Sequence, residues 1–230
     1  MGNKEQIQIQ LRQNRFLKRA ALWSFAAFLI GGVIFGLIKF NGNTFSGQTV
    51  SLSNVISVSD WTKGNQKAKI IIIEYSDFQC PACGFYYPLI KQLVVDFNDK
   101  IQFTYRHFPL KQIHQNAELA AFAAEAAGKQ MKFWEMHDLI FENQSKWSDQ
   151  INAKNTFLSY AQSLQLDIER FKNDLDSKEI KEKVKNDYQS GIQSGVNSTP
   201  TFFLNDRKIQ NPRNYDKFRN IIKQAVNTNS

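Results

Sequence analysis

The 230-residue sequence contains little cysteine and little histidine. Its two cysteines, Cys80 and Cys83, are separated by two residues in the motif CPAC, and its three histidines are scattered. A structural zinc site takes about four ligands, and the histidines show none of the paired spacing that would complete a set begun by two cysteines. A disulfide that closes so short a loop removes little entropy from the unfolded chain, so it would stabilise the fold only weakly. Redox chemistry therefore suits this pair better than metal binding or a structural cross-link, and no cofactor is predicted.

Basic residues are in excess but do not form a single block. The chain has a formal net charge of +8 at pH 7, and its Lys and Arg residues are interspersed with Asp and Glu along the segments that we predict to be helical. A nucleic-acid-binding surface gathers cations on one face, whereas mixed charges are typical of a solvated surface. The sequence therefore argues against a nucleic-acid partner.

Charge is missing altogether from Ala20 to Ile38, a run of nineteen residues. This length is close to the roughly 20 apolar residues that cross a hydrocarbon core as a helix, and it is long for the apolar region of a signal peptide. Four basic residues between positions 12 and 19 precede the run and only Lys39 follows it closely. The positive-inside bias then places the N-terminus in the cytoplasm. We predict a single-pass cell-membrane protein whose remaining chain lies on the extracytoplasmic side, in a periplasm or at the cell exterior.

The N-terminal part is predicted to comprise a cytoplasmic segment (1–19), a transmembrane signal-anchor helix (20–40) and a tether (41–59). The tether is rich in Ser, Asn and Gly and is expected to hold one short edge strand near residues 55–58. A cleaved signal peptide is the alternative, but the sequence TFS at residues 44–46 is a poor small-x-small cleavage site.

Residues 60–230 are predicted to form one α/β domain with a helical insert at about 112–190. A continuous β-branched run indicates a strand buried on both faces. Pro81 suits the first turn of a helix that Pro88 should kink. Apolar residues from Phe85 to Phe97 recur at helical spacing, which predicts an apolar face on that helix. Alanine-rich and polar–apolar segments of the insert indicate four or five helices. The expected elements are a strand at 69–75, a helix at 81–97, a strand at 101–106, the insert, a hairpin from 199 and a helix at 215–226.

The two cysteines lie where the buried strand gives way to a helix. At a helix N-terminus the first sulfur meets unpaired backbone N–H groups and the positive end of the macrodipole, which lower its pKa. Cys80 is therefore expected to be the nucleophile, and Cys83, one turn into the helix, the resolving thiol that closes the disulfide. Glu74, six residues before Cys80, is either a proton carrier for Cys83 or a strand-edge acid paired with a lysine such as Lys69 or Lys91.

Four segments resemble the DsbA-like family of thiol-disulfide oxidoreductases: EYSDFQCPACGFYYP, YRHFPL, AAFAAEAAGKQMKFWEMHDLIFEN and GVNSTPTFFLN. The resemblance implies a thioredoxin fold with an all-α helical insertion, here preceded by one N-terminal transmembrane helix. It implies an active-site loop in which Pro81 and Ala82 separate the cysteines and face a second loop with a cis bond at Pro200. The backbone of Thr199 would then be free to pair with an extended substrate, and Glu74 takes the place of the family's buried acid.

Two positions depart from the family pattern. Ala82 stands where the best-known member has histidine, and Asn197-Ser198 replaces the usual glycine before the Thr-Pro pair. Without an imidazole one hydrogen-bond donor to the Cys80 thiolate is lost, so we expect a disulfide less oxidising than that of the prototype. The histidines of this chain are expected to be structural, and none is assigned a role in catalysis.

The hypothesis that follows is an extracytoplasmic enzyme that donates its Cys80–Cys83 disulfide to unfolded or folding exported proteins. Export favours this function because disulfides persist outside the cytosol. The resemblance implies reoxidation by a quinone-linked membrane protein of the DsbB or vitamin K epoxide reductase type. A tethered reductase or isomerase, fed with electrons from the cytoplasm, would use the same motif. A tethered chaperone or binding module with vestigial cysteines is the alternative of another class.

Overall fold

The computed structural model describes residues 56–228. The predicted cytoplasmic segment, the predicted transmembrane helix and most of the predicted tether lie outside these residues. Within residues 56–228, no helix combines the length and the apolar character needed to span a bilayer.

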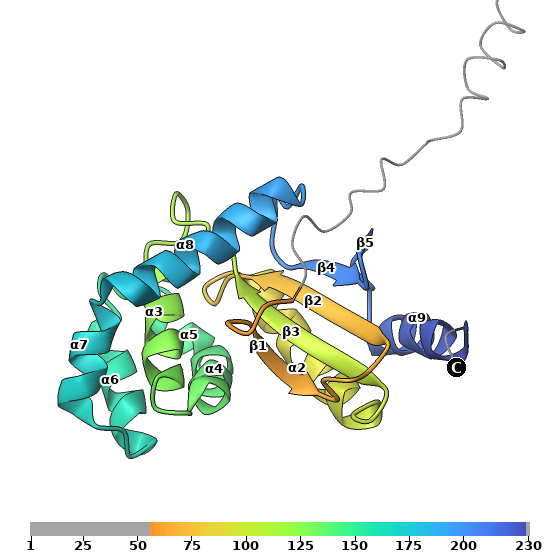
Figure 1. Cartoon of the computed structure of the whole chain (residues 1–230). Helices are drawn as coiled ribbons and strands as arrows, with labels where there is room; N and C mark the ends of the chain where they lie inside the picture. Colours follow the sequence, from red (N-terminus) through yellow and green to blue (C-terminus); the bar gives the residue numbers. More distant parts are fainter. Residues whose placement is uncertain (1–55, 229–230) are drawn as a thin grey trace, which may run out of the picture. The chain divides into compact units, whose positions relative to one another are not determined.

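The central feature of the described part is one five-stranded mixed sheet (Figure 1). Its strands are β1 (Trp61–Gly64), β2 (Ile70–Ser76), β3 (Ile101–His107), β4 (Thr201–Leu204) and β5 (Arg207–Ile209). Their order across the sheet is β1-β3-β2-β4-β5, and β2 pairs in parallel with β3 and antiparallel with β4. The β-branched sequence of β2 suits this central position because both faces of the strand are covered.

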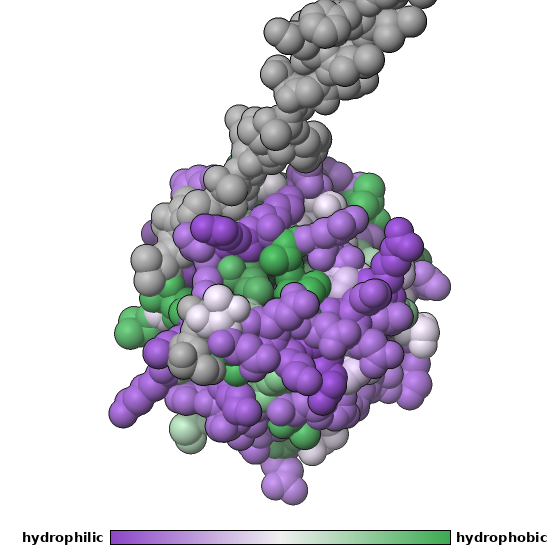
Figure 2. All heavy atoms as spheres, turned by 90° about the vertical axis from the view of Figure 1, so that its right-hand side faces the viewer, coloured by the Kyte–Doolittle hydropathy of each residue, from purple (hydrophilic) through white to green (hydrophobic). Residues whose placement is uncertain are grey.

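One face of the sheet is covered by α2 (Pro81–Asp96) and α9 (Tyr215–Thr228). Phe202 of β4 contacts Tyr86 of α2 and Phe218 of α9 through ring edges, with centroids 5.2 and 5.1 Å apart. The outer side of α9 is exposed, and Figure 2 shows a mostly hydrophilic surface there, broken by small apolar areas. This surface agrees with the mixed charge pattern of the sequence.

The segment between β3 and β4 is helical and lies beside the sheet (Figure 1). Its helices are α3 (Ala117–Gly128), α4 (Phe133–Glu142), α5 (Gln144–Trp147), α6 (Lys154–Ser163), α7 (Ile168–Leu175) and α8 (Lys178–Gln193). The buried alanines of α3 allow α4, α7 and α8 to pack closely around it. Four or five helices were expected in the insert, and it has six, one of which, α5, is a single turn between α4 and α6.

The predicted edge strand near residues 55–58 is wrong as far as the described residues extend. Residues 56–60 form a loop and turn, and the edge strand β1 starts at Trp61. Trp61 stacks on Phe133 with ring centroids 4.4 Å apart, and a Cβ atom at Gly128 would lie 2.3 Å from its indole. Packing against the insert and pairing with β3 therefore decide where the strand forms.

The apolar face predicted for the helix after the cysteines holds with one exception. The buried residues of α2 are Cys83, Tyr86, Ile90 and Leu93, at the three- and four-residue spacing of one helix face. Phe85 was expected on this face but is 56% exposed. It lies one residue before Tyr86, which turns it away from the buried stripe, and it contacts only the edge of the Tyr86 ring among the described aromatic contacts.

Candidate active site

The CPAC motif forms the first turn of α2. Cys80 is the N-cap residue, with an extended backbone (φ −68°, ψ 122°), and Pro81 follows within the first turn. Proline suits this position because its missing N–H would have no helical partner. Both cysteines are free thiols, so the structure describes the reduced form.

The two sulfurs have different surroundings. Cys80 is 8% exposed, whereas Cys83 is fully buried. A hydrogen bond from the Cys83 thiol, more than any other interaction, lowers the pKa of Cys80 to about 5, helped by the Thr199 side chain and by the backbone N–H groups of Cys83 and Ala82. Burial, together with the hydrogen bond and the charge at Cys80, raises the pKa of Cys83. The first sulfur is thus held as a thiolate while the second keeps its proton.

The Thr-Pro loop lies against the first cysteine, although 119 residues separate them. The peptide bond between Thr199 and Pro200 is cis, as expected. The Cys80 Sγ atom is 3.5 Å from the Thr199 carbonyl oxygen, and Thr199 is only 9% exposed. Thr199 therefore bounds the space that a partner of Cys80 would enter.

Glu74 lies in the middle of β2 and is only 4% exposed. Its Oε1 atom accepts a hydrogen bond from Ser76 Oγ at 2.7 Å. Burial raises the pKa of Glu74 to about 7, against the opposing effect of the Ser76 hydrogen bond. β2 is paired on both sides at Glu74, so the carboxyl is not on a strand edge, and Lys91 pairs instead with Glu142 at 2.9 Å. The carboxyl can therefore hold or release a proton near neutral pH.

The family model described as Thioredoxin matches residues 57–224. The chain belongs to the thioredoxin family. Its CPAC motif lies at the N-terminus of α2, as the resemblance to DsbA-like thiol-disulfide oxidoreductases implied. The expected thioredoxin fold with a helical insertion is confirmed.

Solved structures of the same fold come from several bacteria. Alpha-DsbA1 of Wolbachia pipientis is 25% identical, with a TM-score of 0.66, and the match covers 76% of this chain and 94% of that one. BdbD of Bacillus subtilis, in its oxidised form, is 24% identical, with a TM-score of 0.65 over 77% of this chain and 98% of that one. The second likeness is one of fold alone.

Curated relatives of this thioredoxin-family chain include proteins named as Na(+)/H(+) antiporters. The NhaA 3 protein of Salinispora tropica is 36% identical over 166 residues, covering 72% of this chain and 24% of the antiporter. That of Herminiimonas arsenicoxydans is 32% identical over 189 residues, covering 80% of this chain and 29% of the antiporter. The chain spans about a quarter of the length of these relatives, which are membrane proteins by name.

Sequence reasoning missed the residues that hold the CPAC loop in place. Asp77 is buried and accepts hydrogen bonds from the backbone N–H groups of Gln79 and Leu110, both at 2.8 Å. Its position directly after the buried strand was a signal that could have been used. Gln144, at the start of α5, donates to the carbonyl oxygens of Phe78 at 2.7 Å and of Cys80 at 2.9 Å. No sequence pattern marks Gln144, because it meets the loop only through the fold.

The histidines have internal partners. His114 Nδ1 lies 2.7 Å from Asp77 Oδ2, and His137 Nδ1 lies 2.9 Å from Asp138 Oδ1. His107 contacts Glu125 at 2.9 Å through its ring. These contacts agree with the structural role expected for all three.

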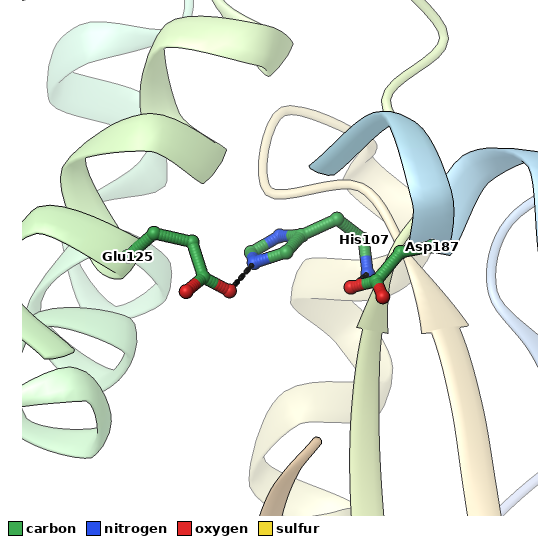
Figure 3. A group of neighbouring side chains, drawn as sticks. All are labelled: His107, Glu125 and Asp187. Carbon is green, nitrogen blue, oxygen red and sulfur yellow. Dashed lines mark hydrogen bonds and ion pairs between the residues drawn. The ribbon is translucent and has the colours of Figure 1, made fainter. Parts of the chain in front are cut away.

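His107, Glu125 and Asp187 form the group that could gather three metal-ligand atoms within residues 56–228 (Figure 3). Their ligand atoms all lie within 4.8 Å of one another. The Lys183 ammonium is 2.6 Å from Asp187 Oδ2 and 3.9 Å from Glu125 Oε1, so the chain supplies a cation to this cluster itself. The cluster connects β3, α3 and α8. Its negative charge is paired by Lys183, so the arrangement needs no metal ion to explain it.

Proposed function

We propose that this chain is an extracytoplasmic oxidase that donates its Cys80–Cys83 disulfide to unfolded or folding exported proteins. This proposal rests on the different surroundings of the two sulfurs. They lower the pKa of Cys80 to about 5 and raise the pKa of Cys83. A thiolate that is stabilised in the reduced form makes the disulfide easier to reduce, and hence a stronger oxidant.

The size of this effect follows from the pKa of Cys80. At pH 7 a thiol whose pKa falls from 9.0 to about 5 is ionised rather than protonated. The reduced form then gains about 2.7 kcal/mol, which corresponds to roughly 60 mV for a two-electron couple. The protonated Cys83 contributes nothing further at this pH, because an unperturbed thiol is also protonated.

The exchange proceeds in two steps that balance atoms and electrons. A substrate thiolate attacks Cys80 Sγ, the disulfide breaks, and the leaving Cys83 sulfur takes a proton from the Glu74 carboxyl. The second substrate thiol then attacks the substrate sulfur of the mixed disulfide, Cys80 leaves as a thiolate, and the proton released returns to Glu74. The substrate is oxidised by two electrons and the enzyme disulfide is reduced.

The loops around the cysteines suit an extended substrate. Pro81 and Ala82 leave no bulky side chain between the cysteines, and Thr199 and Pro200 bound the opposite side. A segment of unfolded chain laid along Thr199 would bring its thiol to Cys80 by backbone pairing.

The wider setting of the reaction is also a proposal. Residues 20–40 would anchor the enzyme in the membrane with the domain at 60–230 outside, and residues 41–59 would tether it. A quinone-linked membrane protein of the DsbB or vitamin K epoxide reductase type would restore the disulfide, and a tether raises the local concentration of the two partners. A reductase or isomerase remains the rival within enzymes.

The reduction potential of the Cys80–Cys83 pair tests the proposal. The full chain in detergent would be equilibrated against glutathione at pH 7, and a Cys83→Ser variant, which cannot close the disulfide, would give the baseline. We expect a value near or above about −150 mV, toward the oxidising end of the thioredoxin-fold range. A value near about −270 mV, like that of thioredoxin, would overturn the oxidase in favour of a reductase. A double Cys→Ser variant that retains activity in protein folding would favour the chaperone.

A further inference from the structure

A cavity of about 200 Å³ lies between the middle of α2 and α4, away from the two sulfurs. Its walls are mostly apolar and rich in aromatic rings, and its polar groups are few. The lining residues that carry the argument are Glu74, Tyr87, Phe103, Trp134 and Phe141. Of these lining residues, only Glu74 takes part in the exchange reaction proposed above.

The inner end of the cavity holds the carboxyl of Glu74. Its Oε1 atom accepts a hydrogen bond from Ser76, and within residues 56–228 no hydrogen bond reaches its Oε2 atom. A side chain that is buried this deeply normally has all its polar atoms paired. The cavity thus ends on a hydrogen-bond acceptor with unused capacity.

The walls provide flat apolar contact. The rings of Tyr87 and Phe141 are stacked, with centroids 5.3 Å apart and planes 20° from parallel. The ring of Trp134 lies 6.1 Å from that of Phe103. Aromatic walls favour a flat aromatic guest, which can meet them by stacking or through ring edges.

The mouth of the cavity is lined by charged side chains that form ion pairs with one another. Asp138 lies between Lys63, at 3.8 Å, and Lys91, at 3.4 Å, and the Lys63 ammonium is 4.5 Å from the centroid of the Trp134 ring. All three side chains are partly exposed, whereas Glu74 at the other end is buried. A ligand would therefore enter between the lysines and advance toward the acid.

We propose that this cavity is a binding site for a small one-ring aromatic compound with a hydrogen-bond donor on the ring, such as a phenol. An apolar cavity of about 150 Å³ takes up benzene, so about 200 Å³ accommodates one substituted ring. The ring occupies the aromatic walls and its hydroxyl donates to Glu74. The site shares Glu74 with the proposed exchange reaction but needs neither sulfur, so binding can be measured whether or not the chain is an oxidase.

The test measures binding to a full-length Cys80→Ser/Cys83→Ser chain in detergent by fluorine NMR. The probes are 3-fluorophenol and fluorobenzene, which differ in the hydroxyl group. We expect 3-fluorophenol to bind about tenfold more tightly, since a hydrogen bond to a buried acceptor is worth about 1.4 kcal/mol. Equal binding of the two probes, or binding of neither, would overturn the proposal.

Two variants locate the binding. Val94→Trp places an indole in the cavity wall and should abolish binding of both probes, whereas Ile151→Phe adds a ring at a side chain that is 94% exposed and should leave binding unchanged. The pair also corrects for uptake of the probes by micelles. Glu74→Leu should keep fluorobenzene binding and remove the preference for the phenol. Wild-type behaviour of Val94→Trp, or a preference that survives Glu74→Leu, would place the ligand elsewhere and refute the site. A reduction potential that contradicts the oxidase function would not change any of these binding results.

Discussion

Replacing Glu74 by glutamine should stabilise the folded protein at alkaline pH and leave it unchanged in acid. Burial raises the pKa of Glu74 from 4.5 to about 7, so the folded chain holds this proton more tightly than the unfolded chain does. The destabilisation caused by the buried carboxylate is therefore absent below about pH 4.5 and complete above about pH 7. It amounts to about 3 kcal/mol at pH 8, since each pKa unit is worth about 1.4 kcal/mol.

The assay is denaturant unfolding of reduced wild type and reduced Glu74→Gln at about pH 4, 6 and 8. The reduced form is used because the charge of the Cys80 thiolate adds to the effect of burial on the pKa of Glu74. Subtracting the two curves cancels every other titrating group. The difference in the free energy of unfolding should be near zero at pH 4 and should reach about 3 kcal/mol in favour of the variant at pH 8.

Glu142→Gln is the matched control. A hydrogen bond from Lys91 lowers the pKa of Glu142, so its carboxylate contributes stability above its unfolded pKa and loses it in acid. This variant should therefore lose a little stability at pH 8, with the opposite slope. A Glu74 difference that stays flat from pH 4 to pH 8 would refute the argument, because it would mean that the folded carboxyl titrates as in the unfolded chain.

Further predictions concern the cysteine, the loop and the buried cation. The rate of alkylation of Cys80 in the reduced chain should rise with pH, with a midpoint near pH 5. A midpoint near pH 9.0, the ordinary pKa of the thiol, would show that the thiolate is not stabilised. Gln144→Ala leaves two loop carbonyls without their donor and should cost about 1–3 kcal/mol in denaturant unfolding, whereas Gln92→Ala, which loses a hydrogen bond to Asp96 on the exposed side of α2, should cost little. Lys183→Met removes the cation from a buried carboxylate and should lower the free energy of unfolding by about 3–5 kcal/mol. Lys172→Met breaks only an exposed pair and should have little effect. Equal losses in the two variants would show that the buried ion pair of Lys183 does not stabilise the fold.

Local sequence patterns determined most of the secondary structure and the position of the reactive pair. The β-branched run before the cysteines and the 3–4 spacing after them gave β2 and α2 within a residue or two, because a buried strand and an amphipathic helix carry their own periodicity. The same junction placed Cys80 at a helix N-terminus, from which its lowered pKa could be argued. The sequence alone therefore indicated which sulfur is the nucleophile and which is the resolving thiol.

Tertiary structure decided what surrounds that pair. Thr199 meets Cys80, and Gln144 meets the loop, only after distant segments have packed together, and contacts of this kind leave no local pattern. β1 formed at Trp61 rather than earlier because edge strands depend on their pairing partner. The raised pKa of Glu74, and the cavity beside it, likewise depend on how α2 and α4 close over the sheet, since burial is a property of the packed chain and not of the residue.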